Sequence, residues 1–161
     1  MEQFDKEQVR KIWQRVQGEK TGLTTTANAK EPCLGIPEAI ARELSCAAMY
    51  TMLAKQLPQK AGSILYRLAR EEQQHAATLK GICTLSGGFC PPAKPAPIRK
   101  APAGVLLRQC YGQKLQAMAE YEKCVTDPMH GNVYREMAQQ EQAQCRILLQ
   151  LIGNLKSGMH K

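Results

Sequence analysis

The stretch LAREEQQHAATL, residues 68–79, lies at the centre of the sequence pattern that decides the fold. In and around it, a set of six residues, four of them aliphatic, recurs at alternating intervals of three and four, which is the spacing of one face of an α-helix. Glu72 and His75 fall on that face among leucines, so a helix over roughly 60–86 carries both polar side chains toward the core. The face consists of Leu65, Leu68, Glu72, His75, Leu79 and Ile82.

Three further segments have the same amphipathic character and similar length. They cover roughly 37–57, 104–126 and 129–156, and each is bounded by a proline or glycine that interrupts a helix. Aromatic residues are only 5% of the chain, and the segments are dominated by residues that lose little conformational entropy on entering a helix. The sequence therefore predicts an all-α fold.

The segment 87–104 decides how the helices connect. It contains five prolines, which exclude a helix and an interior strand. At about 3.1 Å per residue an extended segment of this length reaches about 50 Å, whereas a helix of 25 residues is about 38 Å long. The segment can therefore cross the full length of a bundle, while short loops make the first two helices and the last two antiparallel. We expect a four-helix bundle with one long crossover.

We expect the bundle to occupy residues 37–161 as a single domain, preceded by an extra N-terminal element over 1–36. The sequence QFDKEQVRKIWQRVQG places apolar residues near one side of a short helix from residue 3 to about 17. Residues 18–36 lack this periodicity and contain a threonine triplet and Pro32, which is typical of a loop. The N-terminal helix is interpreted as a docking helix.

Composition favours a location in the cytoplasm. No run of 18 apolar residues exists, and the N-terminus has no signal-peptide pattern, so we expect neither a membrane span nor secretion. The seven cysteines form no CxxC pair, and we expect reduced thiols that pack as small apolar side chains, with Cys33 and Cys90 in loops. The net charge of +8 permits nucleic-acid binding but is no evidence for it, and we expect no such partner.

The two predicted helix pairs repeat one polar pattern. In each pair, a polar residue on the first helix is followed 28 or 29 residues later by a glutamate, with a further polar residue at i+3. Three buried glutamates and a histidine need a cation, a proton or a dense hydrogen-bond network, because each uncompensated carboxylate would cost several kcal/mol. The residues are Glu43, Glu72 and His75 in the first pair and Gln113, Glu141 and Gln144 in the second.

Four segments resemble, in order, the helix motifs of the rubrerythrin branch of the ferritin-like superfamily. They are IARELSCAAMY, LAREEQQHAATL, CYGQKLQAMAEYEK and AQQEQAQ, and the resemblance covers about residues 37–156. It implies a carboxylate-bridged di-iron centre. Position by position, it implies metal ligands at Glu43, Glu72, His75 and Glu141, and tyrosines that bond to ligand carboxylates at Tyr50 and Tyr121.

Two positions depart from this family pattern, and both lie in the second half. Gln113 stands where the family has a glutamate and Gln144 where it has a histidine, so they form at most a weaker second half-site through amide oxygens. Three carboxylates remain, which leaves a net charge of +1 with two divalent ions or −1 with one. One metal ion therefore fits better than two.

Three functions are open at this point, one of which, ferritin-like DNA protection or storage, rests only on the net charge of +8 and on fold analogy. The resemblance implies an iron-binding protein, with manganese or zinc as other candidate metals, that acts as an oxidase or peroxidase and pairs as a homodimer. Such a protein would need an external electron donor, because the rubredoxin-like cysteine motifs of the family are absent. The alternative is a non-enzymatic ferritin-fold binding or structural protein that has lost one or both metals, so that its polar core residues hydrogen-bond one another.

Overall fold

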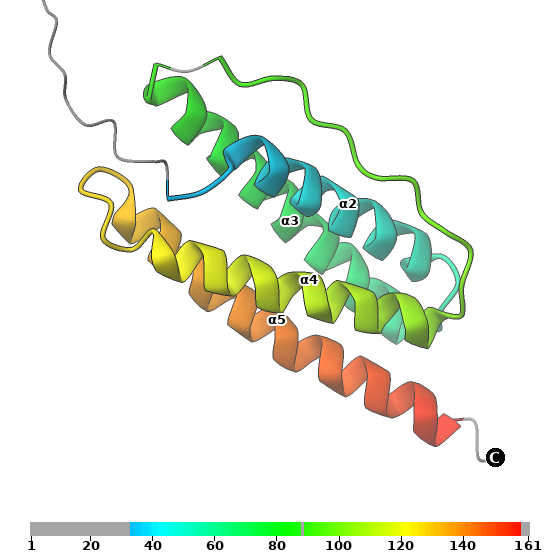
Figure 1. The fold of residues 1–161 in the computed structure, drawn as a ribbon. Helices are drawn as coiled ribbons and strands as arrows, with labels where there is room; N and C mark the ends of the chain where they lie inside the picture. Colours follow the sequence, from blue (N-terminus) through cyan, green and yellow to red (C-terminus); the bar gives the residue numbers. More distant parts are fainter. Residues whose placement is uncertain (1–32, 88, 159–161) are drawn as a thin grey trace, which may run out of the picture. The chain divides into compact units, whose positions relative to one another are not determined.

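The computed structural model describes residues 33–87 and 89–158. The predicted N-terminal helix and most of the loop after it lie outside these residues. The described residues form four α-helices and no strand (Figure 1), which confirms the all-α prediction. The helices are α2 (Ile36–Ala54), α3 (Gln59–Leu85), α4 (Ala103–Lys123) and α5 (Gly131–Gly158).

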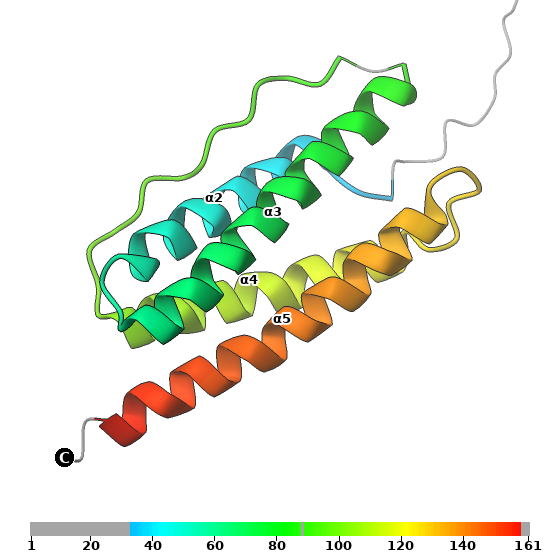
Figure 2. The same cartoon turned by 180° about the vertical axis from the view of Figure 1, so that it is seen from behind.

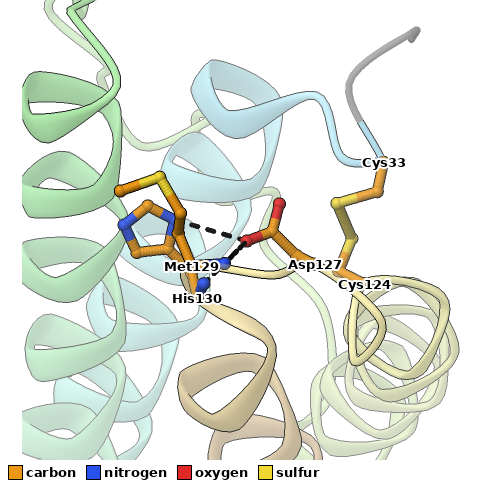
Figure 3. Close-up of a disulfide and its surroundings, with 5 residues drawn as sticks. All are labelled: Cys33, Cys124, Asp127, Met129 and His130. Atoms are coloured by element: carbon orange, nitrogen blue, oxygen red, sulfur yellow. Dashed lines mark hydrogen bonds and ion pairs between the residues drawn. A yellow bond between two sulfur atoms is a disulfide. The ribbon is translucent and has the colours of Figure 1, made fainter.

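Prolines set most of the helix ends. Pro37 lies in the first turn of α2, where its missing N–H costs nothing, and Pro58 and Pro102 directly precede α3 and α4. The start of α5 is set instead by Asp127, whose Oδ1 accepts hydrogen bonds from the backbone N–H groups of Met129 (3.0 Å) and His130 (2.6 Å), as Figure 3 shows. The predicted helix bounds therefore agree with the structure to within a few residues.

The crossover runs along the length of the bundle, from the end of α3 to the start of α4 (Figures 1 and 2). Because it returns the chain to the other end, α3 and α4 run in the same direction, while α2 with α3 and α4 with α5 form antiparallel pairs. This is the predicted single-crossover topology. No described helix has both the length and the apolar character of a membrane span.

Ser45 fastens the crossover to α2. Its hydroxyl donates to the carbonyl oxygen of Ala41 one turn earlier (2.7 Å) and accepts the backbone N–H of Ala96 in the crossover (2.8 Å). Farther along the crossover, Ile98 packs against the apolar core. The Pro-rich segment is therefore held against the bundle by both a hydrogen bond and apolar contacts.

The apolar core consists of two clusters with polar residues between them. One cluster joins the second half of α2 to the first half of α3, and the other joins their opposite halves; each also includes residues of α4 and α5. The buried charged and imidazole side chains occupy positions along the helices between the two clusters. These polar residues are Glu43, Glu72, His75, Lys114 and Glu141.

A disulfide between Cys33 and Cys124 links the segment before α2 to the end of α4 (Figure 3). The Cα atoms are 5.4 Å apart although 91 residues separate the two cysteines in sequence. The prediction of reduced thiols is wrong for this pair, because the fold brings together cysteines that no local motif connects. Disulfides are rare in the cytosol, so this bond weighs against the cytoplasmic location, which stays a prediction.

Replacing Ser45 with alanine should weaken the attachment of the crossover. The variant loses two hydrogen bonds of Ser45, and we expect the free energy of unfolding to fall by about 1 kcal/mol, measured by urea denaturation. Ser63→Ala is the matched control, because the Ser63 hydroxyl bonds only within its own helix, to Gln59, and is exposed. Equal effects of the two substitutions would show that the contact between Ser45 and Ala96 contributes nothing.

Candidate metal centre

Four buried side chains from three helices meet in the middle of the bundle. Glu43 comes from α2, Glu72 and His75 from α3, and Glu141 from α5, and one donor atom of each lies within 4.8 Å of the others. Their exposed fractions are between 0% and 3%. Carboxylate oxygens and an imidazole nitrogen so close together could hold a metal ion.

Helix periodicity accounts for this convergence. Glu72 and His75 are three residues apart on α3, so both side chains project from one face within a single turn. Glu43 and Glu141 lie on the buried faces of α2 and α5, the faces that also carry core residues such as Ile40 and Leu148. The four residues singled out from the sequence as metal ligands are therefore brought together by the fold.

A fifth residue, Lys114 of α4, lies among the carboxylates. Its Nζ donates to Oε2 of Glu43 (2.8 Å), to Oε1 of Glu141 (3.2 Å) and to Oε2 of Glu72. It also forms an ion pair with Oε2 of Glu141 (3.1 Å). The whole side chain is buried, with 0% exposure. The ammonium therefore supplies one positive charge against three buried carboxylates.

Sequence reasoning missed Lys114, although the spacing to the tyrosines contained a signal. Tyr50 follows Glu43 by seven residues, and Tyr121 follows Lys114 by seven, whereas it follows Gln113 by eight. In the repeat of the two helix pairs, Lys114 is therefore the counterpart of Glu43. A lysine is almost never fully buried unless it is paired, so its position on the buried stripe of α4 indicated a partner.

The two glutamines of the expected second half-site bond to groups outside the carboxylate cluster. Gln113 Oε1 accepts a hydrogen bond from the thiol of Cys46 (3.1 Å), and Gln144 Nε2 donates to Oε2 of Glu71 (3.1 Å). Of these residues, Gln144 is itself buried, with 1% exposure. The side chains that α4 and α5 contribute to the cluster are therefore Lys114 and Glu141.

Charge and burial set the protonation of the cluster. Burial opposes ionisation of Glu43, but the Lys114 ammonium and hydrogen bonds from Glu72, Lys114 and Tyr121 outweigh it and lower the pKa of Glu43 to about 2. Burial raises the pKa of Glu72 well above its usual value, with partial relief from Lys114. Burial also disfavours the charged form of Lys114, yet the carboxylates around it raise its pKa well above normal, so it stays an ammonium.

His75 is oriented by a partner on α5. Its Nε2 lies 2.6 Å from the amide oxygen of Gln140, which can only accept, so Nε2 is the donor and Nδ1 faces the carboxylates. Nδ1 lies 3.0 Å from Oε1 of Glu141. Burial alone would lower the pKa of His75, but the contacts with Glu141 and Gln140 raise it. In its neutral form, the ring presents Nδ1 as the ligand atom for a metal ion.

The two tyrosines differ in their bonding. The Tyr121 hydroxyl donates to Oε1 of Glu43 at 2.5 Å, as the resemblance implied. The hydroxyl of Tyr50 has no hydrogen-bond partner among the described residues. In the repeat of the two helix pairs, Lys114 corresponds to Glu43 and Tyr50 corresponds to Tyr121. The residue expected to pair with Tyr50 is therefore Lys114, whose ammonium offers no acceptor. A lysine could only donate to the Tyr50 hydroxyl, and the Lys114 ammonium donates to the three carboxylates instead.

Comparison with known proteins assigns neither a family nor a function to this chain. No protein-family model and no curated protein matches this chain. The helical bundle with its buried glutamate and histidine side chains is consistent with a ferritin-like fold. The functional interpretation therefore rests on the geometry of the cluster.

Replacing Lys114 with methionine should strongly destabilise the protein. Methionine keeps a similar length but leaves three buried carboxylates without their cation, and we expect a loss of about 3–5 kcal/mol in the free energy of unfolding near neutral pH. The loss should shrink as the pH falls from about 4.5 toward about 2, because protonation of Glu43 removes the ion pair with Lys114 from the unaltered protein as well. Lys123→Met, an exposed change on the same helix, is the control, and an equally small effect of both changes would contradict the role of Lys114.

Replacing the two tyrosines with phenylalanine should have unequal effects. Tyr121→Phe removes a hydrogen bond to a buried carboxylate and should cost about 1.5–3 kcal/mol of stability, whereas Tyr50→Phe removes an unpaired hydroxyl and should change stability by less than about 0.5 kcal/mol. Urea denaturation of both variants measures the difference. A larger effect at Tyr50 than at Tyr121 would disprove the asymmetry.

Proposed function

We propose that this protein binds one divalent transition-metal ion through Glu43, Glu72, His75 and Glu141, with Lys114 in the place of a second metal ion. The observation that carries the proposal is the position of the Lys114 ammonium among three carboxylates. One divalent ion and one ammonium together balance three ionised glutamates when His75 is neutral. A second divalent ion would leave the buried cluster with two excess positive charges.

The donor set favours iron or manganese. Three carboxylates and one imidazole form an oxygen-rich mixed site, whereas structural zinc sites use mainly cysteine and histidine. Oε1 of Glu72 has no hydrogen-bond partner among the described residues, so this buried oxygen is free to coordinate. We propose iron as the physiological metal, with manganese and zinc as the alternatives.

The proposed activity is that of an oxidase or peroxidase similar to rubrerythrin. A bound iron ion would supply redox chemistry, and the protein would provide the carboxylate and imidazole ligands that hold it in an apolar core. The sequence resemblance supports this part of the proposal. Electrons would come from an external donor, because the chain has no Cys-x-x-Cys motif.

A second candidate function follows from the same lysine. Lys114 bonds to all three carboxylates, so the cluster is compensated in a form that needs no metal. A neutral Glu72 and a charged His75 would complete the balance, in agreement with the raised pKa of each. In that case the protein is a metal-free structural or binding module with a ferritin-like fold.

Metal retention separates these two functions. After anaerobic loading with ferrous iron and desalting, elemental analysis should find one ion per chain, and Glu72→Ala and His75→Ala should abolish retention. Glu71→Ala is the matched control, because Glu71 is adjacent in sequence but outside the cluster, and it should retain the ion. No metal in the unaltered protein would favour the metal-free module.

Replacing Lys114 with glutamate should convert the site to two ions. The variant would restore a fourth carboxylate at the counterpart of Glu43 and would offer Tyr50 an acceptor. Two divalent ions then balance four carboxylates, so iron retention should rise from one ion to two per chain. Retention that stays at one ion would show that Lys114 does not stand in for a metal.

A further inference from the structure

Sulfur-bearing side chains from α2 and α4 meet in the apolar cluster that joins the second half of α2 to the first half of α3. The thiol of Cys110 donates to Sδ of Met49 at 3.2 Å, and the thiol of Cys46 donates to Oε1 of Gln113 at 3.1 Å. The exposed fractions of Cys46, Met49 and Cys110 are 0%, 4% and 0%, and all three residues belong to this one cluster. We refer to these three residues as the sulfur cluster.

The register of α2 and α4 accounts for the sulfur cluster. Cys46 and Met49 are three residues apart on α2, so they share one face within a single turn. Cys110 and Gln113 are related in the same way on α4. Because α2 and α4 run in opposite directions (Figures 1 and 2), the first residue of each pair faces the second residue of the other, as the two hydrogen bonds show. The sulfur of Cys46 therefore lies about one helical turn from the contact between Cys110 and Met49.

Thiolate and thioether sulfur are soft ligands that select Cu(I) among the metal ions of cells, whereas carboxylate oxygen favours harder ions. We propose that the sulfur cluster binds one Cu(I) ion through Cys110 and Met49, with Cys46 as the third sulfur ligand. The monovalent ion takes the place of one thiol proton, which passes to solvent, so the charge of the apolar core is unchanged. The site is distinct in its donor atoms from the carboxylate cluster and does not depend on metal binding there.

Met49 gives the sulfur cluster the adaptability that a bound ion requires. Metal–sulfur bonds of about 2.3 Å, the length of a zinc–sulfur bond, hold two sulfur ligands of a trigonal site about 4 Å apart. The sulfur atoms of Cys110 and Met49 are 3.2 Å apart, so they must separate by about 0.8 Å. Rotation about the three flexible bonds of methionine supplies such a shift without movement of a helix. The hydrogen-bond partner of Cys46, Gln113, is half-buried, so rotation of this one side chain gives an ion a route to the cluster.

Copper binding tests the proposal on the full-length protein. The protein is incubated without oxygen with Cu(I), added as its acetonitrile complex, in competition with a Cu(I) chelator that removes the ion from single thiols. After desalting, elemental analysis should find about one copper ion per chain. Cys110→Ala and Met49→Leu should each weaken binding by about tenfold or more, since even the loss of a residue that supports a metal ligand has an effect of this size. Methionine and leucine are similar in volume, so Met49→Leu keeps the core packed, and circular dichroism checks that both variants fold.

Two variants outside the sulfur cluster provide the controls. Cys145→Ala removes a buried thiol that belongs to neither apolar cluster, and Glu72→Ala removes a donor of the carboxylate cluster. Both variants should bind Cu(I) as tightly as the unaltered protein does. No retained copper in the unaltered protein, unchanged binding in Cys110→Ala, or an equal loss in Cys145→Ala would each overturn the proposal. Loss of copper in Glu72→Ala would overturn it as well, because the ion would then belong to the carboxylate cluster.

Discussion

The contact between the Lys114 ammonium and three buried glutamates is the interaction on which the centre of this bundle depends. The glutamates come from α2, α3 and α5, and the lysine comes from α4, so one ionic cluster joins all four helices. Burying any of these charges alone would be costly, because only an opposite charge from another helix offsets the loss of hydration. The register of the two helix pairs relative to one another is therefore constrained by a single side chain.

This interaction also makes the two halves of the bundle chemically different. The α2 and α3 half offers Glu43, Glu72 and His75, whereas the α4 and α5 half offers a cation and Glu141. The hydroxyl of Tyr121 finds an acceptor across the bundle, and its counterpart on α2 does not. A repeated backbone arrangement thus carries a chemically asymmetric cluster of donor atoms that could hold a metal ion.

Most of the fold could be predicted from the sequence, because helix periodicity and proline positions are local signals. The convergence of Glu72 and His75 with the other glutamates followed from the same periodicity. Lys114 was missed because its neighbour Gln113 lies close to the same stripe and resembles a weakened ligand, while a lysine is expected in solvent. The bond between Cys33 and Cys124 could not be predicted, because it depends on how segments 91 residues apart pack.

The identity of the side chain at position 114 decides how the cluster is compensated. Exchanging a glutamate for a glutamine changes the charge of a site by one, which a divalent ion cannot match. Exchanging a glutamate for a lysine changes it by two, which equals the charge of one divalent ion. A lysine at the counterpart of Glu43 can therefore replace one metal ion and its carboxylate while the buried cluster stays neutral, and the three remaining carboxylates and His75 keep the donor atoms that a single ion needs.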